Sequence, residues 1–281
     1  MKKDNKNYLL SLSELKKVMF SFELKKFPYL NNFSSNPYTY IKARYYMYSS
    51  VLLVFALLRT RITPNSVTIV YALLGIVVGV LLSIPNFYCN LLAVFIAFNK
   101  GILDWSDGHL ARIKYKASLT GHLLDEYGAA LNIIGFYIGL GFFVVHQTGY
   151  HFLIYTIPLI VFFNGEQFRT SASVSIINSL SEIIKTEKNN TSIANEVSDT
   201  NSKENLKRFL EWITKFGLIL DGRARSTDLM LLIVLIDIYY ESYLSLYVYG
   251  VVFFGLMAKF ILSLVLGVRR KWAEQVIQTI K

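Results

Sequence analysis

Residues 101–132 read GILDWSDGHLARIKYKASLTGHLLDEYGAALN and place three aspartates, Asp104, Asp107 and Asp125, in two otherwise apolar segments. Both segments belong to stretches long enough to cross a bilayer. A charged side chain at the centre of a transmembrane helix costs about 2.5–3.5 kcal/mol on insertion scales, so three of them at regular spacing need an explanation. The simplest explanation is a bound divalent cation.

The whole chain has the composition of a polytopic membrane protein. Its 281 residues are 53% hydrophobic and include 20 Phe and 19 Tyr, which is too apolar for a soluble domain of this size. We therefore predict an all-α fold with six transmembrane helices. Short polar joints separate the predicted spans, which lie at about 64–83, 87–112, 120–146, 150–178, 227–240 and 242–267.

The basic residues are distributed very unevenly between alternate joints. Residues 1–61 carry eleven Lys or Arg and residues 169–225 carry nine, whereas the joints 84–88, 146–151 and 239–244 carry none. Because Lys and Arg near membrane ends stay in the cytoplasm, we expect both termini and the aspartates to lie on the cytoplasmic side. Cytoplasmic loops that face anionic lipid account for the net charge of +10, so no nucleic acid partner is expected.

Three regions are predicted along the chain. Residues 1–37 form a cytoplasmic basic arm, residues 38–268 a membrane domain with a polar cytoplasmic joint at about 181–205, and residues 269–281 a cytoplasmic tail. The aromatic and apolar stretch 38–58 is predicted to be a helix that lies along the membrane interface. A seventh span is disfavoured because it would place the basic arm outside the cytoplasm.

Helical spacing brings the aspartates together. Asp104 and Asp107 are three residues apart and share one helix face. Gly108 has no side chain, so the backbone beside them is left uncovered. In the next span a second face carries Gly121, Asp125, Gly128 and Asn132. If these faces pack together, three carboxylates meet, and hard oxygen ligands suit Mg²⁺ or Mn²⁺. The glycines leave room for a diphosphate beside the metal.

Two other interpretations of this spacing stay open. The glycines can serve only to let helices approach closely, with the aspartates solvated at the membrane surface. Alternatively, buried acids can line an ion or proton pathway, as in a small transporter, although such acids are expected deeper in the membrane and on more helices.

The spacing of these residues also resembles a known signature. It reads Asp, two residues, Asp-Gly, two residues, Ala-Arg, eight residues, Gly, three residues, Asp, and it is similar to that of the CDP-alcohol phosphotransferases. The fixed positions present here are Asp104, Asp107, Gly108, Ala111, Arg112, Gly121 and Asp125. A Pro-Asn-x-x-Thr opening of the first span, Pro64 to Thr68, extends the resemblance.

The resemblance implies a membrane transferase of phospholipid biosynthesis. Such an enzyme moves a substituted phosphate, usually phosphatidyl, from a CDP-linked donor such as CDP-diacylglycerol to a small alcohol and releases CMP. It implies that Asp104, Asp107 and Asp125 hold Mg²⁺, and it also implies a homodimer. The residues implied to frame the nucleotide are Gly108, Ala111, Arg112, Gly121 and, from the first span, Thr68.

The chain departs from the signature at its eighth fixed position. The family places there an aspartate that helps to bind metal and is given the role of general base, whereas this chain has Ala129. Candidates to replace that group are His122, Glu126 and Asn132, of which Asn132 can only hydrogen-bond. The alternative is a catalytically silent homologue that binds CDP-lipid as a regulator or partner.

Three arginines are candidates for binding a phosphorylated acceptor. Arg169, Arg223 and Arg225 flank the long polar joint on its predicted cytoplasmic side. Guanidinium groups bind phosphate through forked hydrogen bonds, so glycerol phosphate or inositol phosphate is a plausible acceptor. Cytoplasmic arginines also serve topology and lipid headgroups, and the sequence leaves both roles open.

Overall fold

The computed structural model describes residues 10–27, 33–34, 37–116, 118–165 and 223–269. Every regular element within these ranges is a helix, and no strand occurs among them, which confirms the all-α prediction. The chain forms two compact units, residues 1–143 and 144–281.

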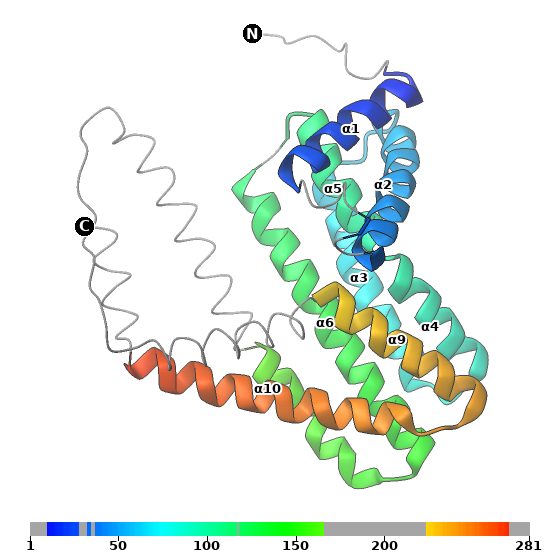
Figure 1. Ribbon diagram of the computed structural model, residues 1–281, viewed down its shortest axis with the longest axis vertical. Coiled ribbons are helices and arrows are strands. Elements are labelled where there is room, and N and C mark those ends of the chain that lie inside the picture. Colours follow the sequence, from blue (N-terminus) through cyan, green and yellow to red (C-terminus); the bar gives the residue numbers. More distant parts are fainter. Residues whose placement is uncertain (1–9, 28–32, 35–36, 117, 166–222, 270–281) are drawn as a thin grey trace. The chain divides into compact units, whose positions relative to one another are not determined.

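The first unit holds most of the helices (Figure 1). They are α1 (Leu12–Lys26), α2 (Pro37–Leu58), α3 (Pro64–Ser83), α4 (Phe87–Asn99), α5 (Gly101–Ile113) and most of α6 (Leu119–Thr148). Side chains start several of them: Ser11 and Glu14 form a capping box on α1, and the Thr63 hydroxyl accepts from the Ser66 amide ahead of α3. Pro64 occupies the first turn of α3, where its missing N–H costs nothing.

The second unit contains the end of α6, the 3-10 helix η3 (His151–Tyr155) with a helical segment at 156–165, α9 (Arg223–Tyr240) and α10 (Leu244–Arg269). A buried aspartate, Asp237, joins α9 to α10. Its Oδ2 accepts from the Ser245 amide at 2.6 Å, and its Oδ1 accepts from the Leu244 amide at 3.1 Å. Asp237 therefore caps the start of α10, and its contacts account for its burial.

Five helices of the described chain are long and apolar enough to cross a membrane: Pro37–Leu58, Pro64–Ser83, Phe87–Ile113, Thr120–Thr148 and Leu244–Leu262. The last four coincide with predicted spans. The predicted interfacial helix 38–58 also meets these criteria of length and composition. The predicted span 150–178 runs beyond the described residues and 227–240 falls in α9, which is not one of the five, so the count of six remains a prediction.

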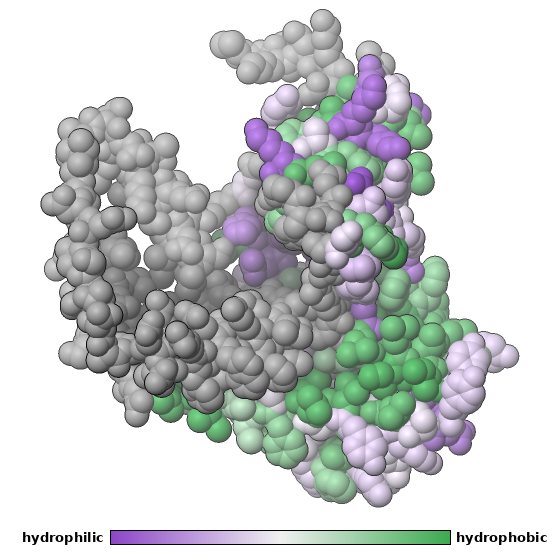
Figure 2. Space-filling view, viewed as in Figure 1, coloured by the Kyte–Doolittle hydropathy of each residue, from purple (hydrophilic) through white to green (hydrophobic). Residues whose placement is uncertain are grey.

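The surface of the first unit agrees with a membrane setting. Figure 2 shows hydrophilic residues gathered around α1. Large exposed apolar side chains of α4 include Phe87, Leu92 and Phe95, the last 66% exposed. Because α4 has no polar outer face, we infer that its exposed side contacts lipid.

Helices α3 and α6 touch backbone to backbone through glycines. A Cβ at Gly79 or Gly135 would overlap a carbonyl oxygen of the facing helix, and a Cβ at Gly139 would lie 2.7 Å from the Gly79 oxygen. Small residues permit such close approach between membrane helices. This contact fixes the register of α6 against α3.

Replacing Gly135 by Val is therefore expected to destabilise the protein strongly. The new side chain must push α6 away from α3, and overpacking of this kind costs about 3 kcal/mol of unfolding free energy. Denaturant unfolding of the purified protein in detergent measures this change. Gly250→Val is the matched control, because no neighbouring atom of the described residues lies within 4 Å of a Cβ built there, and its stability is expected to change by less than about 1 kcal/mol. Equal stability of both variants would contradict the glycine contact.

Helices α1, α2 and α5 pack around one hydrophobic cluster. Its buried members are Leu15, Met19, Val51, Val54, Leu58, Val67, Leu110 and Ile113. Just past α5, the Lys114 ammonium donates to three carbonyl oxygens at the end of α2 and in the joint that leads to α3, those of Leu57, Thr60 and Ile62. These contacts hold α5 against the start of α3, where the candidate site lies.

Candidate metal and nucleotide site

Asp107 on α5 and Thr68 on α3 are joined by a short hydrogen bond. The Thr68 hydroxyl donates to Asp107 Oδ2 at 2.6 Å, and the two residues are only 3% and 6% exposed. A buried carboxylate is stabilised by such a charge-assisted bond. Two residues singled out in the sequence, 39 positions apart, therefore meet in the fold.

Asp104 and Asp125 approach one another from α5 and α6. The carboxyl groups of Asp104 and Asp125 are near enough for each to affect the charge of the other, and Asp104 is also within electrostatic reach of Asp107. Two ionised carboxylates offer only acceptors and repel one another, so a shared proton or a cation would stabilise such a pair. The three aspartates thus lie close to one another where α3, α5 and α6 meet.

The glycines beside the aspartates differ in what surrounds them. Among the described residues, a Cβ at Gly108 would meet the Arg112 guanidinium at 3.8 Å and no closer side chain, so the surface beside Gly108 is open in this part of the chain. A Cβ at Gly121 would lie 3.2 Å from Asn65 and Ser118 side-chain oxygens, and one at Gly128 would lie 3.2 Å from the Tyr71 ring. Gly108 therefore offers an open strip of backbone, whereas Gly128 serves the packing of α6 on α3.

The three candidates for the missing base lie in different settings on α6. Asn132 is 1% exposed, and its amide nitrogen donates to the carbonyl oxygens of Tyr71 and Gly128 at 2.9 and 3.0 Å. These bonds make Asn132 part of the helix contact. His122 is exposed, and both His122 and Glu126 interact electrostatically with Asp125. Ala129 follows Asp125 by one turn of the same helix, so its methyl group takes the place of a carboxylate beside the site.

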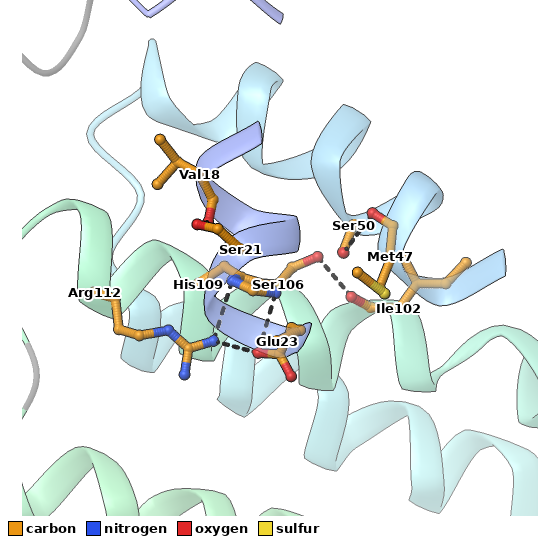
Figure 3. A network of polar contacts seen from close by, with 9 residues as sticks. All are labelled: Val18, Ser21, Glu23, Met47, Ser50, Ile102, Ser106, His109 and Arg112. Atoms are coloured by element: carbon orange, nitrogen blue, oxygen red, sulfur yellow. Dashed lines mark hydrogen bonds and ion pairs between the residues drawn. The ribbon is translucent and has the colours of Figure 1, made fainter. Parts of the chain in front are cut away.

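Arg112 takes part in a polar network with two residues that were not among the predicted site residues (Figure 3). Its Nη2 donates to Glu23 Oε1 of α1 at 2.9 Å and contacts His109 Nδ1 at 3.1 Å. Glu23 follows the buried Leu15 and Met19 at four-residue intervals, which place all three on one face of α1. That spacing is the signal that indicates burial of Glu23.

The acceptor arginines are less well defined. Arg169 lies outside the described residues, and Arg223 and Arg225 lie in the first turn of α9, where only the backbone is described.

In the described part of the chain, no three His, Cys, Asp or Glu side chains converge closely enough to hold a metal ion.

Fold and site together define a helical membrane protein with carboxylates gathered between α3, α5 and α6, beside an open backbone strip. Residues 61–186 match the family model described as CDP-alcohol phosphatidyltransferase, which confirms the resemblance drawn from the sequence. The match begins just before α3 and includes α4, α5 and α6, and it leaves α1 and α2 outside. No curated protein matches the chain. The match supports a transferase that takes a phosphatidyl group from a CDP-alcohol.

Proposed function

We propose that the protein transfers a phosphatidyl group from a CDP-linked donor such as CDP-diacylglycerol to a small alcohol, with release of CMP, at the cytoplasmic face of a membrane. The observation that carries this proposal is the signature spacing of Asp104, Asp107 and Asp125 within the matched segment, where the Thr68 hydroxyl donates to Asp107. Both termini lie in the cytoplasm in this proposal, because the basic residues gather in the joints on that side.

The donor set at the site suits Mg²⁺ or Mn²⁺. Asp104, Asp107 and Asp125 would hold the ion, which usually takes one or two carboxylates and completes its coordination with water and substrate phosphate oxygens. A site of this kind does not require three carboxylates to contact the ion at once. When bound, the metal supplies a Lewis acid that polarises the diphosphate and offsets its charge.

The chain's own residues then position the donor. The Thr68 hydroxyl holds the Asp107 carboxylate by its 2.6 Å bond, so that the other carboxylate oxygen remains for the ion. Gly108, Ala111, Arg112 and Gly121 frame the nucleotide diphosphate, with the open strip at Gly108 admitting its oxygens. The hydroxyl oxygen of the acceptor attacks the lipid-linked phosphorus, the phosphoanhydride bond breaks, and CMP leaves.

The hydroxyl proton needs an acceptor, because Ala129 has none. Of the candidates, His122 and Glu126 lie within electrostatic reach of Asp125, whereas the Asn132 amide is already bonded within the helix contact. We therefore propose that His122 or Glu126 takes the proton, less effectively than an aspartate at position 129 would. Arg169, Arg223 and Arg225 remain the proposed ligands of a phosphorylated acceptor, and a homodimer remains the proposed assembly.

A second function is favoured by one observation, the alanine at position 129. Without its carboxylate the protein could bind CDP-lipid without turnover and act as a regulator or partner. Equilibrium binding of CDP-diacylglycerol to the protein in lipid nanodiscs, with and without Mg²⁺, tests what the two functions share. Both require Mg²⁺-dependent binding, and its absence would contradict both.

A further inference from the structure

The helix α1 lies outside the matched family segment, yet it contributes a buried carboxylate to the signature helix α5. We propose that Glu23 is a positioning residue for Arg112, so that α1 forms part of the donor site. This inference rests on the proposed function, because it concerns how tightly the CDP-linked donor is held.

The network is a closed triangle of side chains (Figure 3). Glu23 Oε1 lies 2.9 Å from Arg112 Nη2 and 3.5 Å from His109 Nε2, and Arg112 Nη2 lies 3.1 Å from His109 Nδ1. Since a guanidinium only donates, Nδ1 of His109 must accept, and its proton then sits on Nε2, the nitrogen nearer to Glu23 Oε1. All three contacts are satisfied when His109 is neutral, Glu23 is negative and Arg112 is positive.

Burial leaves Glu23 and His109 without water as an alternative hydrogen-bond partner. Glu23 is 7% exposed and His109 is 1% exposed, so neither can turn to water for hydrogen bonds. A buried carboxylate without a partner is costly, and removing one member of such a pair is strongly destabilising for the other. The packing of Leu15 and Met19 into the hydrophobic cluster fixes α1, and therefore the carboxylate, in its place.

The guanidinium is held over the strip that the diphosphate would use. Apart from its chain neighbours and the backbone of its own helix, a Cβ built at Gly108 would meet one atom of the described residues within 4 Å, Arg112 Nη2 at 3.8 Å. Arg112 Nε is buried and has no hydrogen-bond partner among the described residues, so one donor of the group is not used by the protein. Glu23 and His109 therefore orient the guanidinium through Nη2 and leave other N–H groups for an anion.

A double-mutant cycle on donor binding tests this inference. Affinity for CDP-diacylglycerol in Mg²⁺ is measured in lipid nanodiscs for the wild type, Glu23→Gln, Arg112→Ala and the double variant. Glu23→Gln is expected to weaken binding about tenfold, equal to about 1.4 kcal/mol. In the Arg112→Ala background the same change is expected to alter affinity less than twofold, because a residue that acts through Arg112 has nothing left to position.

Two further variants separate positioning from folding. Glu14→Gln makes the same chemical change on the exposed first turn of α1 and is expected to keep wild-type affinity. Glu23→Asp keeps the charge and is expected to bind more tightly than Glu23→Gln. Thermal unfolding midpoints measured without donor identify any variant that is not folded. If Glu23→Gln is not folded, Glu23→Asp replaces it in the cycle.

The outcomes distinguish this inference from the proposed function. If the wild type binds the donor and Glu23→Gln leaves that affinity unchanged, the positioning role alone is overturned. The same follows if Glu23→Gln weakens donor binding equally with and without Arg112. Tighter binding by Glu23→Gln would also overturn it, because Glu23 would then compete with the donor for Arg112. No binding by the wild type would overturn both the proposed function and this inference.

Discussion

Asp107→Asn is expected to abolish Mg²⁺-dependent CMP release, with a loss of at least about 10³-fold, because it removes a charge that the metal and the diphosphate depend on. Asparagine has nearly the same shape as aspartate, and its side-chain oxygen still accepts from the Thr68 hydroxyl. The 2.6 Å link between α3 and α5 is therefore preserved while the negative charge is lost. This variant tests the charge rather than the packing.

Initial rates of CMP release at several Mg²⁺ concentrations measure the effect of Asp107→Asn. Glu241→Gln, an exposed carboxylate-to-amide change just after α9, is the matched control and is expected to leave both rate and metal dependence unchanged. Thermal unfolding of Asp107→Asn establishes that it is folded. A folded Asp107→Asn protein with full activity would contradict the proposed metal site.

Ala129→Asp is expected to have the opposite effect and to raise the rate of CMP release by about 10²-fold, within the range of a positioned general base. The new carboxylate stands one helical turn after Asp125 on α6, where it supplies both a metal ligand and a proton acceptor. Ala129 is partly exposed, so the larger side chain has access to the site without displacing a core residue.

Ala129→Asn separates these contributions, because asparagine has the size of aspartate and cannot take a proton. Single-turnover CMP release from bound CDP-diacylglycerol compares the wild type with both variants. We expect only Ala129→Asp to be faster than the wild type. Equal rates for wild type and Ala129→Asp would show that another group, such as His122 or Glu126, already completes the chemistry.

The sequence predicted the main features of the first unit because they follow from local periodicity. Membrane-length apolar runs gave the bounds of α3 and α6 closely, and helical spacing placed Asp104 and Asp107 on one face. The structure has these two carboxylates in electrostatic contact with each other and with Asp125. What each carboxylate binds is a separate question, and their roles as metal ligands stay predictions.

Other parts of the site depend on contacts between distant residues and could not be predicted in this way. The partner of Arg112 is Glu23, 89 positions earlier, in a segment whose lysines and asparagines indicate a solvated arm. Asn132 shared the face of Asp125 and was a candidate for the site, yet α6 packs so closely on α3 at Gly75 that its amide is used within the helix contact. Periodicity gives the face of a helix but not the neighbour against which that face packs.

The most direct test of the proposed transferase is CMP release by the purified protein in lipid with Mg²⁺ and CDP-diacylglycerol, measured with glycerol phosphate, inositol phosphate, serine or inositol as acceptor. We expect CMP release that requires both Mg²⁺ and one of the alcohols, and the active alcohol then identifies the acceptor class. Mg²⁺-dependent donor binding without CMP release for any acceptor would contradict the transferase and favour a silent CDP-lipid-binding homologue.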